Sequence, residues 1–111
     1  MAEYVELTID QGATYTNTIN VTDANGAGID LTGYTTRSEM RKSYYSTTSY
    51  PFTLSFINAA NGSISMGMSA ANTANLSPGR YVYDVEIEDP SGNITRIFEG
   101  IIAVLPNVTK S

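Results

Sequence analysis

The sequence predicts an all-β domain, an immunoglobulin-like antiparallel β-sandwich of about seven strands. Apolar and polar residues alternate with a period of two along most of the chain, and turn-forming residues interrupt this alternation at short intervals. The length of 111 residues fits one domain with a single core. We expect residues 1–106 to form this domain and residues 107–111 to be a C-terminal tail. A partly closed barrel is the alternative architecture.

Seven segments carry the alternation. In each segment the apolar residues fall on one face of an extended chain and the polar residues fall on the other. The expected strands are residues 5–10, 15–21, 34–42, 52–56, 64–68, 81–88 and 94–105. Because they occupy the apolar positions between turn signals, the residues expected in the core are Leu7, Ile19, Leu54, Ile64, Tyr83, Val85 and Ile87.

Turn chemistry separates the expected strands. Asn61 with Gly62 adopts positive backbone φ angles at low cost, and Pro with Gly reverses the chain after residue 77. One segment, near residues 69–75, breaks the strand pattern: Ser69 can cap a single helical turn, after which Leu76 packs back into the core. The expected turns are residues 11–13, 23–26, 58–62, 77–79 and 89–92.

Composition argues against several functional classes. The chain has no cysteine, which excludes disulfides and zinc–thiolate sites, and no histidine, the commonest general base. Its net charge is −5 and its six basic residues are mostly scattered, which is unfavourable for nucleic-acid binding. No apolar run approaches the roughly 20 residues of a membrane-spanning helix, and no secretory signal is visible. We therefore expect a protein that is not an enzyme and that binds neither nucleic acid nor membrane.

Two acidic patterns suggest chemistry but have simpler interpretations. Asp23, Asn25 and Asp30 loosely resemble a calcium loop, but Tyr34 stands where a bidentate carboxylate is required, so a turn-rich loop is the better interpretation. Asp84 and Glu86 have the spacing of a glycosidase pair, and that spacing also occurs on any solvated strand face. The sequence predicts no catalytic residue, no metal site and no cofactor.

The candidate partner contacts lie in residues 43–50, the only low-complexity stretch of the sequence, and in the expected strand 34–42 before it. Tyr44, Tyr45 and Tyr50 sit among Ser and Thr residues, a composition that gives adaptable contacts, as in antibody loops. Arg37 and Arg41 lie on one face of the expected strand 34–42. If this strand neighbours strand 81–88, the two arginines meet its acidic residues across the sheet. Alternatively, the tyrosines fold back over the edge of the sandwich.

The last expected strand is apolar on both faces towards its end. The apolar residues of this segment cannot all face one core: they are Ile97, Phe98, Ile101, Ile102, Val104 and Leu105. An uncovered apolar face is rare in a monomer, so this strand predicts a homo-oligomer or a subunit docked on a second protein. The alternative is that residues 43–50 of the same chain fold over the strand and cover its apolar face.

One longer pattern resembles a known family. It runs through residues 23–34, residues 61–66 and residues 69–87. In order, it consists of an expected strand, a one-turn helix that starts after Ser69, the sequence Leu76-Ser77-Pro78-Gly79, and a strand that starts with Arg80-Tyr81. In this order the chain resembles small β-sandwich domains of tailed-bacteriophage virion proteins, including the N-terminal domains of baseplate upper proteins.

The resemblance implies a structural protein in the tail, baseplate or neck, holding other virion subunits after assembly in the host cytoplasm. It supplies no catalytic residues. The lack of cysteine agrees with assembly in a reducing compartment. A capsid decoration protein, or a module whose tyrosine loop binds a carbohydrate or host-surface ligand, are the alternatives.

Overall fold

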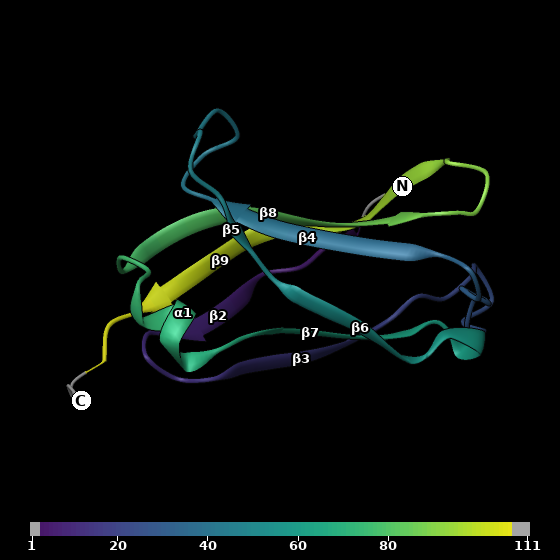
Figure 1. Ribbon diagram of the computed structural model, residues 1–111, viewed down its shortest axis with the longest axis horizontal. Coiled ribbons are helices and arrows are strands. Elements are labelled where there is room, and N and C mark those ends of the chain that lie inside the picture. The colour runs from purple at the N-terminus through teal and green to yellow at the C-terminus, as the bar shows by residue number, and fades with distance from the viewer. Residues whose placement is uncertain (1–2, 108–111) are drawn as a thin grey trace.

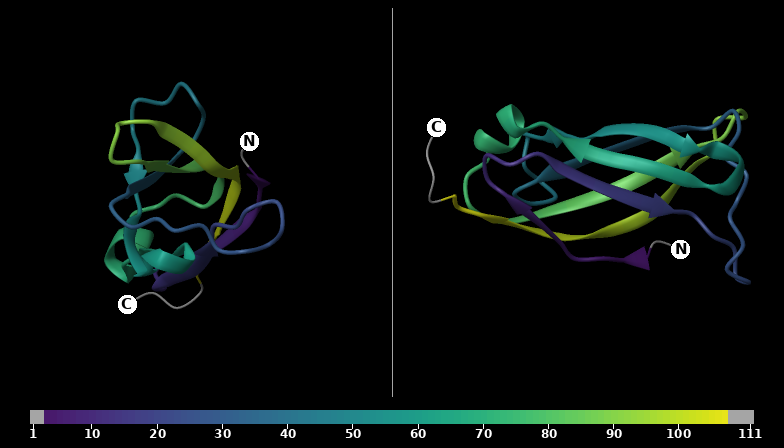
Figure 2. Two further views of the ribbon diagram at one scale, coloured as in Figure 1. Left: turned by 90° about the vertical axis from the view of Figure 1, so that its right-hand side faces the viewer. Right: turned by 90° about the horizontal axis from the view of Figure 1, so that it is seen from below.

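The computed structural model describes residues 3–107 and consists of two β-sheets packed face to face (Figures 1 and 2). The larger sheet has the strand order β1-β9-β8-β4-β5, with β2 also paired to β9, and the smaller sheet has the order β3-β7-β6. The strands are β1 (Glu3–Tyr4), β2 (Leu7–Asp10), β3 (Tyr15–Asn20), β4 (Thr35–Arg41), β5 (Tyr50–Pro51), β6 (Thr53–Asn58), β7 (Ser63–Met68), β8 (Gly79–Glu88) and β9 (Ile94–Leu105).

The predicted all-β sandwich is confirmed, and so is the single helical turn. That turn is α1 (Ala70–Ala74), and the side chain of Ser69 caps it by accepting a hydrogen bond from the backbone N–H of Asn72. The expected turn before β7 is a 3-10 turn, η1 (Ala59–Asn61). It ends at Gly62, whose φ of 77° is accessible to glycine at little cost. In the described chain, neither helical element is long enough to cross a membrane.

The N-terminal segment departs from the prediction of one antiparallel strand at residues 5–10. It forms two short strands, β1 and β2, and both run parallel to β9. Between them, the backbone N–H of Val5 still bonds to Glu99. The carbonyl of Val5 lies so close to Gly100 that a Cβ atom at position 100 would overlap it. Glycine at 100 therefore allows the first segment to lie along β9.

The β8–β9 hairpin is the longest antiparallel pair and forms the centre of the larger sheet. Its turn is closed by Asp89, whose carboxylate accepts hydrogen bonds from the backbone N–H groups of Ser91 and Asn93, each at 2.9 Å. The register shifts between Val85 and Glu86, opposite Phe98 and Arg96. Strand β4 pairs with the other edge of β8 along its whole length.

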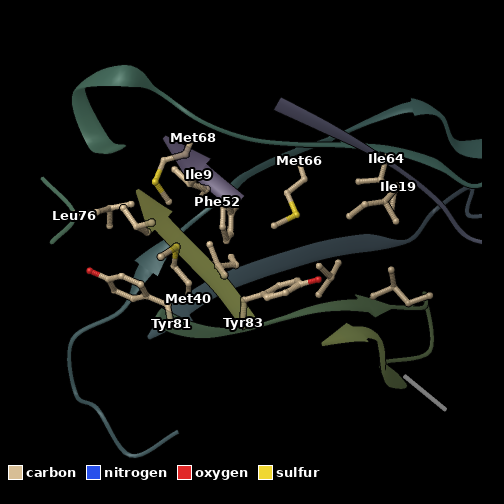
Figure 3. Close-up of a cluster of buried hydrophobic side chains, with 14 of the residues drawn as sticks. Ile9, Ile19, Met40, Phe52, Ile64, Met66, Met68, Leu76, Tyr81 and Tyr83 are labelled. Carbon is tan, nitrogen blue, oxygen red and sulfur yellow. The ribbon is translucent and has the colours of Figure 1, made fainter. Parts of the chain in front are cut away.

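The core fills the space between the two sheets (Figure 3). Five of the seven predicted core residues are buried, but Leu7 and Leu54 are only half-buried and pack against the core from its margin. Both lie on strands with an unpaired edge, β2 and β6, so sandwich packing covers them on one side only. The buried apolar residues are Ile9, Ile19, Val21, Leu31, Met40, Phe52, Ile64, Met66, Met68, Leu76, Tyr81, Tyr83, Val85, Ile87, Ile102 and Val104.

The C-terminal boundary agrees in outline with the expected one. β9 ends at Leu105, and the backbone N–H of Asn107 is 3.5 Å from the side-chain oxygen of Gln11. The remainder of the predicted tail, residues 108–111, lies outside the described residues.

Candidate partner-binding surfaces

The loop between β4 and β5 projects beyond the outer face of the larger sheet (Figure 1). Tyr44 is 72% exposed and Tyr45 is 95% exposed. The base of the loop is held by the Arg41 guanidinium, which donates to the carbonyl of Ser46, and by the backbone N–H of Ser43, which donates to the Ser46 hydroxyl at 3.1 Å. Two large aromatic rings are therefore presented to solvent from an anchored loop.

The third tyrosine of the cluster behaves differently. Tyr50 lies on β5, is half-buried, and packs edge-on against Tyr81 with ring centroids 5.9 Å apart. The Tyr81 hydroxyl donates to the carbonyl of Ser77, and the Lys42 ammonium lies 4.4 Å from the Tyr81 ring centroid. The structure thus brings Tyr44 and Tyr45 onto one exposed loop and separates Tyr50 from them. A contact role for the three tyrosines stays a prediction.

The predicted meeting of β4 and β8 charges is confirmed for Arg37. Its guanidinium lies 3.1 Å from the Glu86 carboxylate and 3.3 Å from that of Glu88. The prediction is wrong for Arg41, which pairs at 2.6 Å with Glu39 on its own strand. The reason is the register, because Arg41 lies opposite the apolar Val82.

A third ion-pair group continues the charged outer face onto β9. The Arg96 guanidinium lies 3.5 Å from the Asp84 carboxylate and 3.4 Å from that of Glu99. Partial burial, followed by the charge of Glu86, raises the pKa of Asp84 above its ordinary value, and Arg96 opposes this. The spaced acids of β8 therefore form cross-strand ion pairs.

A small cavity of about 130 Å³ lies on this outer face. Tyr44 forms one wall of it and Val82 lies among the charged residues. Its lining residues are Glu39, Arg41, Tyr44, Val82, Tyr83, Asp84, Arg96 and Glu99. Two of the predicted contact residues, Tyr44 and Arg41, thus share one site.

A larger groove, of about 570 Å³, lies on the side of the sandwich where β4 and β6 form neighbouring sheet edges. The chain crosses there from β5 in the larger sheet to β6 in the smaller sheet (Figure 1). In the part of the chain that the structure describes, β5 pairs with β4 at Glu39 and Met40 only. The groove is lined by Thr36, Arg37, Ser38, Glu39, Pro51, Phe52, Leu54, Asp84 and Glu86.

Alternation in the sequence does not place an unpaired edge on β4, although one residue signals it. Pro51 has no backbone N–H, so β5 cannot continue as a regular ladder beside β4. Beyond it, the Phe52 N–H donates to the Ser38 carbonyl at 3.0 Å, and the chain then departs to the other sheet. Within residues 3–107, the first half of β4 is left without a strand neighbour on this side.

The last strand, by contrast, is more fully covered than expected. β9 lies inside the larger sheet, with β8 on one edge and β1 and β2 on the other. Ile102 and Val104 are buried in the core, and Ile101 on the other face is half-buried. The apolar residues left exposed are at its ends, Ile94 at 53% and Leu105 at 48%. From the projecting loop, Tyr44 lines a cavity together with Arg96 and Glu99 of this strand.

In the loop of residues 23–34, which resembles a calcium site, the carboxylates accept hydrogen bonds from backbone N–H groups of the same loop. Asp23 accepts from the N–H groups of Asn25 and Ala27, and Asp30 accepts from the N–H and hydroxyl of Thr32. Hydrogen bonding by Thr32 lowers the pKa of Asp30. Across residues 3–107 no three acidic side chains gather as metal ligands would. The loop is a turn structure closed by its own side chains.

Comparison with known proteins gives matches to solved structures only. No protein-family model matches the chain, and no curated protein matches it. An internalin-like protein of Listeria monocytogenes superposes with a TM-score of 0.50 at 21% identity, over 90% of this chain and 27% of that one. At this identity the likeness concerns the β-rich fold alone.

Two further solved structures superpose less well. The sialic acid-binding region of a Streptococcus sanguinis adhesin gives a TM-score of 0.49 at 17% identity, over 92% of this chain and 28% of that one. AggA, the major subunit of aggregative adherence fimbriae type I from Escherichia coli, gives a TM-score of 0.45 at 13% identity, over 90% of this chain and 89% of that one. The chain thus spans little more than a quarter of the first two proteins.

Proposed function

We propose that this protein is a structural subunit of a tailed-bacteriophage virion and acts by assembling with other virion proteins, without catalysing a reaction. The resemblance of residues 23–109 to virion sandwich domains supports the context, with the tail, baseplate or neck as its place and capsid decoration as the alternative. Such a subunit assembles in the host cytoplasm, in agreement with a chain that has no cysteine.

The observation that carries the assembly role is the unpaired edge of β4. Met40 pairs with Tyr50 and the Ser38 carbonyl accepts from Phe52, so alternate residues of β4 direct their backbone groups to this side. Thr36, two residues before Ser38, has the same orientation and lies beyond the end of β5. Unpaired backbone groups on a sheet edge are a template for a strand from another chain.

The groove beside this edge supports a strand as the occupant. An added strand would place alternate side chains towards Leu54 and Phe52 and the others towards the charged outer face. Glu39 and Arg37 on that face carry opposite charges. The partner segment we propose is therefore extended, with apolar residues alternating with polar residues of mixed charge, and it belongs to a second virion subunit.

Self-association is a second form of the same role, because the edge of β4 is available to another copy of the chain as well. Light scattering across micromolar concentrations distinguishes the two forms. A mass that rises with concentration supports a homo-oligomer, whereas a constant monomer mass directs the proposal to a different subunit.

The virion assignment is tested by purifying the particles of the phage that encodes this chain. Particles banded on a density gradient and washed in high salt are digested, and the chain is quantified by mass spectrometry against the major capsid protein. We expect a fixed stoichiometry that survives washing. A chain that is abundant in the lysate and absent from banded particles would overturn the assignment.

A further inference from the structure

The outer face of the larger sheet carries a row of side chains that runs from β1 to β4, and two members of the row, Asp84 and Glu39, also line the groove beside the β4 edge. The register places Tyr4 opposite Glu99, Glu99 opposite Asp84, and Asp84 opposite Glu39, so these residues cross four strands in one line on one face. Tyr44 reaches this row from the projecting loop and lines the cavity with Asp84, Glu99 and Glu39.

We propose that this cavity is a binding site for a single neutral sugar ring, with Tyr44 as its aromatic wall and the Asp84, Glu99, Arg41 and Arg96 side chains as its polar contacts. The inference goes beyond the proposed assembly role, because it assigns a small-molecule ligand class to a cavity that borders the groove and shares Glu39 and Asp84 with it.

The aromatic part of the site is accessible. Tyr44 remains 72% exposed although its loop is anchored by Arg41 and Ser46. Tyr4, at the β1 end of the same row, is 57% exposed. The C–H face of a sugar ring is apolar and packs on the face of an aromatic ring, while the phenol hydroxyl stays in water. Tyr44 offers such a face beside the polar floor.

The polar part of the site matches hydroxyl groups. The carboxylates of Asp84 and Glu99 flank one guanidinium, Arg96, at 3.5 and 3.4 Å. A carboxylate accepts hydrogen bonds and a guanidinium donates them. A sugar hydroxyl does both, so neighbouring hydroxyls can bridge such a pair without breaking it. These bonds are charge-assisted and therefore stronger than neutral ones.

Charge distinguishes a neutral ligand from an ionic one. Three carboxylates, on Glu39, Asp84 and Glu99, face two guanidinium groups, on Arg41 and Arg96, which leaves one net negative charge in the lining. An anionic sugar meets this excess of negative charge. A cation has to compete with arginines that already lie within 3.5 Å of the same carboxylates. A neutral polyhydroxyl ligand avoids both costs.

The size of the site limits the ligand to one ring. A volume of about 130 Å³ equals the liquid volume of about four water molecules, so one sugar ring enters the cavity in part and its remaining atoms stay in solvent. A ligand of this size with partial exposure gives a dissociation constant on the order of 1 mM. Higher avidity requires several copies of the site on one particle.

The test is a nuclear magnetic resonance titration of the ¹⁵N-labelled chain with the methyl glycosides of glucose, galactose and mannose. N-acetylneuraminic acid serves as the anionic comparison. We expect at least one methyl glycoside to shift the amide signals of Val82, Asp84 and Glu99 with a millimolar dissociation constant. No shift with any of the three up to about 100 mM, or tighter binding of N-acetylneuraminic acid, would overturn the proposal.

Two neighbouring tyrosines provide the matched variants. Tyr44→Ala should weaken binding of the responding glycoside at least tenfold, whereas Tyr45→Ala, on the same loop but outside the cavity lining, should change it less than twofold. Asp84→Asn, which replaces an acceptor oxygen with a donor, should weaken binding at least fivefold. Equal effects of the two tyrosine variants would contradict the site. The amide spectrum of each variant reports whether it is folded.

Discussion

The hydroxyl of Tyr83 donates a hydrogen bond of 2.8 Å to the carbonyl of Val5 and so joins β8 to the N-terminal segment across β9. Burial, the largest cause, raises the pKa of Tyr83 well above its ordinary value, so the hydroxyl remains a donor at neutral pH. Tyr83→Phe should lower the free energy of unfolding by about 1 kcal/mol, as measured by urea denaturation. Tyr45→Phe, on an exposed ring, serves as control and should have no effect; equal effects would contradict the role of the bond.

Substitution of Gly100 should lower the free energy of unfolding more than substitution of Tyr83. A Cβ atom at position 100 overlaps the Val5 carbonyl and lies 3.3 Å from the Tyr83 ring, so Gly100→Ala should cost at least about 2 kcal/mol. Because the strain falls on the first segment, amide exchange at Val5 should accelerate more than exchange at Val85. Unchanged exchange at Val5 would show that the N-terminal segment does not depend on this glycine.

The Arg37 ion pairs should contribute little to stability. The Arg37 side chain is 54% exposed, and an exposed pair with a carboxylate is worth less than about 1 kcal/mol. A double-mutant cycle with Arg37→Met and Glu86→Gln should give a coupling energy in that range, and the coupling should shrink in 1 M salt. A larger coupling that is insensitive to salt would contradict this account.

Asp89 should make the β8–β9 turn sensitive to acid. Hydrogen bonds from Asn93, its largest influence, lower the pKa of Asp89 below its ordinary value. Because the folded-state pKa is the lower one, its stabilisation is fully present above the unfolded pKa of about 3.9 and is lost as the pH falls through the folded value. The difference in melting temperature between wild type and Asp89→Ala should therefore narrow from pH 7 to pH 3. A constant difference would contradict this role for the carboxylate.

The elements that local sequence determines were predicted well. Strict alternation from Tyr81 to Ile87 gives the buried face of β8, and the Ser69 cap gives α1, because both depend on residues a few positions apart. The Arg37 pairing, by contrast, joins residues far apart in the chain and was predicted only under the condition that β4 and β8 are neighbours.

Long-range pairing was not accessible from the same pattern. Alternation does not say which strand pairs with which, so the parallel course of β1 and β2 and the interior position of β9 were missed. The candidate site likewise has features that local sequence predicts and features that depend on long-range pairing. The exposure of Tyr44 and Tyr45 follows from a polar loop, whereas the position of Tyr4 in the row with Glu99 depends on a register set by the whole sheet.

The two proposals, that the chain is a virion subunit and that the unpaired edge of β4 mediates its assembly, are tested most directly by the incorporation of two variants at position 36 into phage particles. Thr36→Pro removes the backbone N–H on the free side of β4 and leaves the pairing of Arg37 with β8. Thr36→Val keeps that N–H and, like proline, loses the hydroxyl bond to the Glu86 carbonyl. In particles grown with each variant as the only copy, we predict wild-type incorporation of Thr36→Val and loss of Thr36→Pro, with both variants folded by thermal melting. Equal incorporation of the two would contradict assembly through this edge.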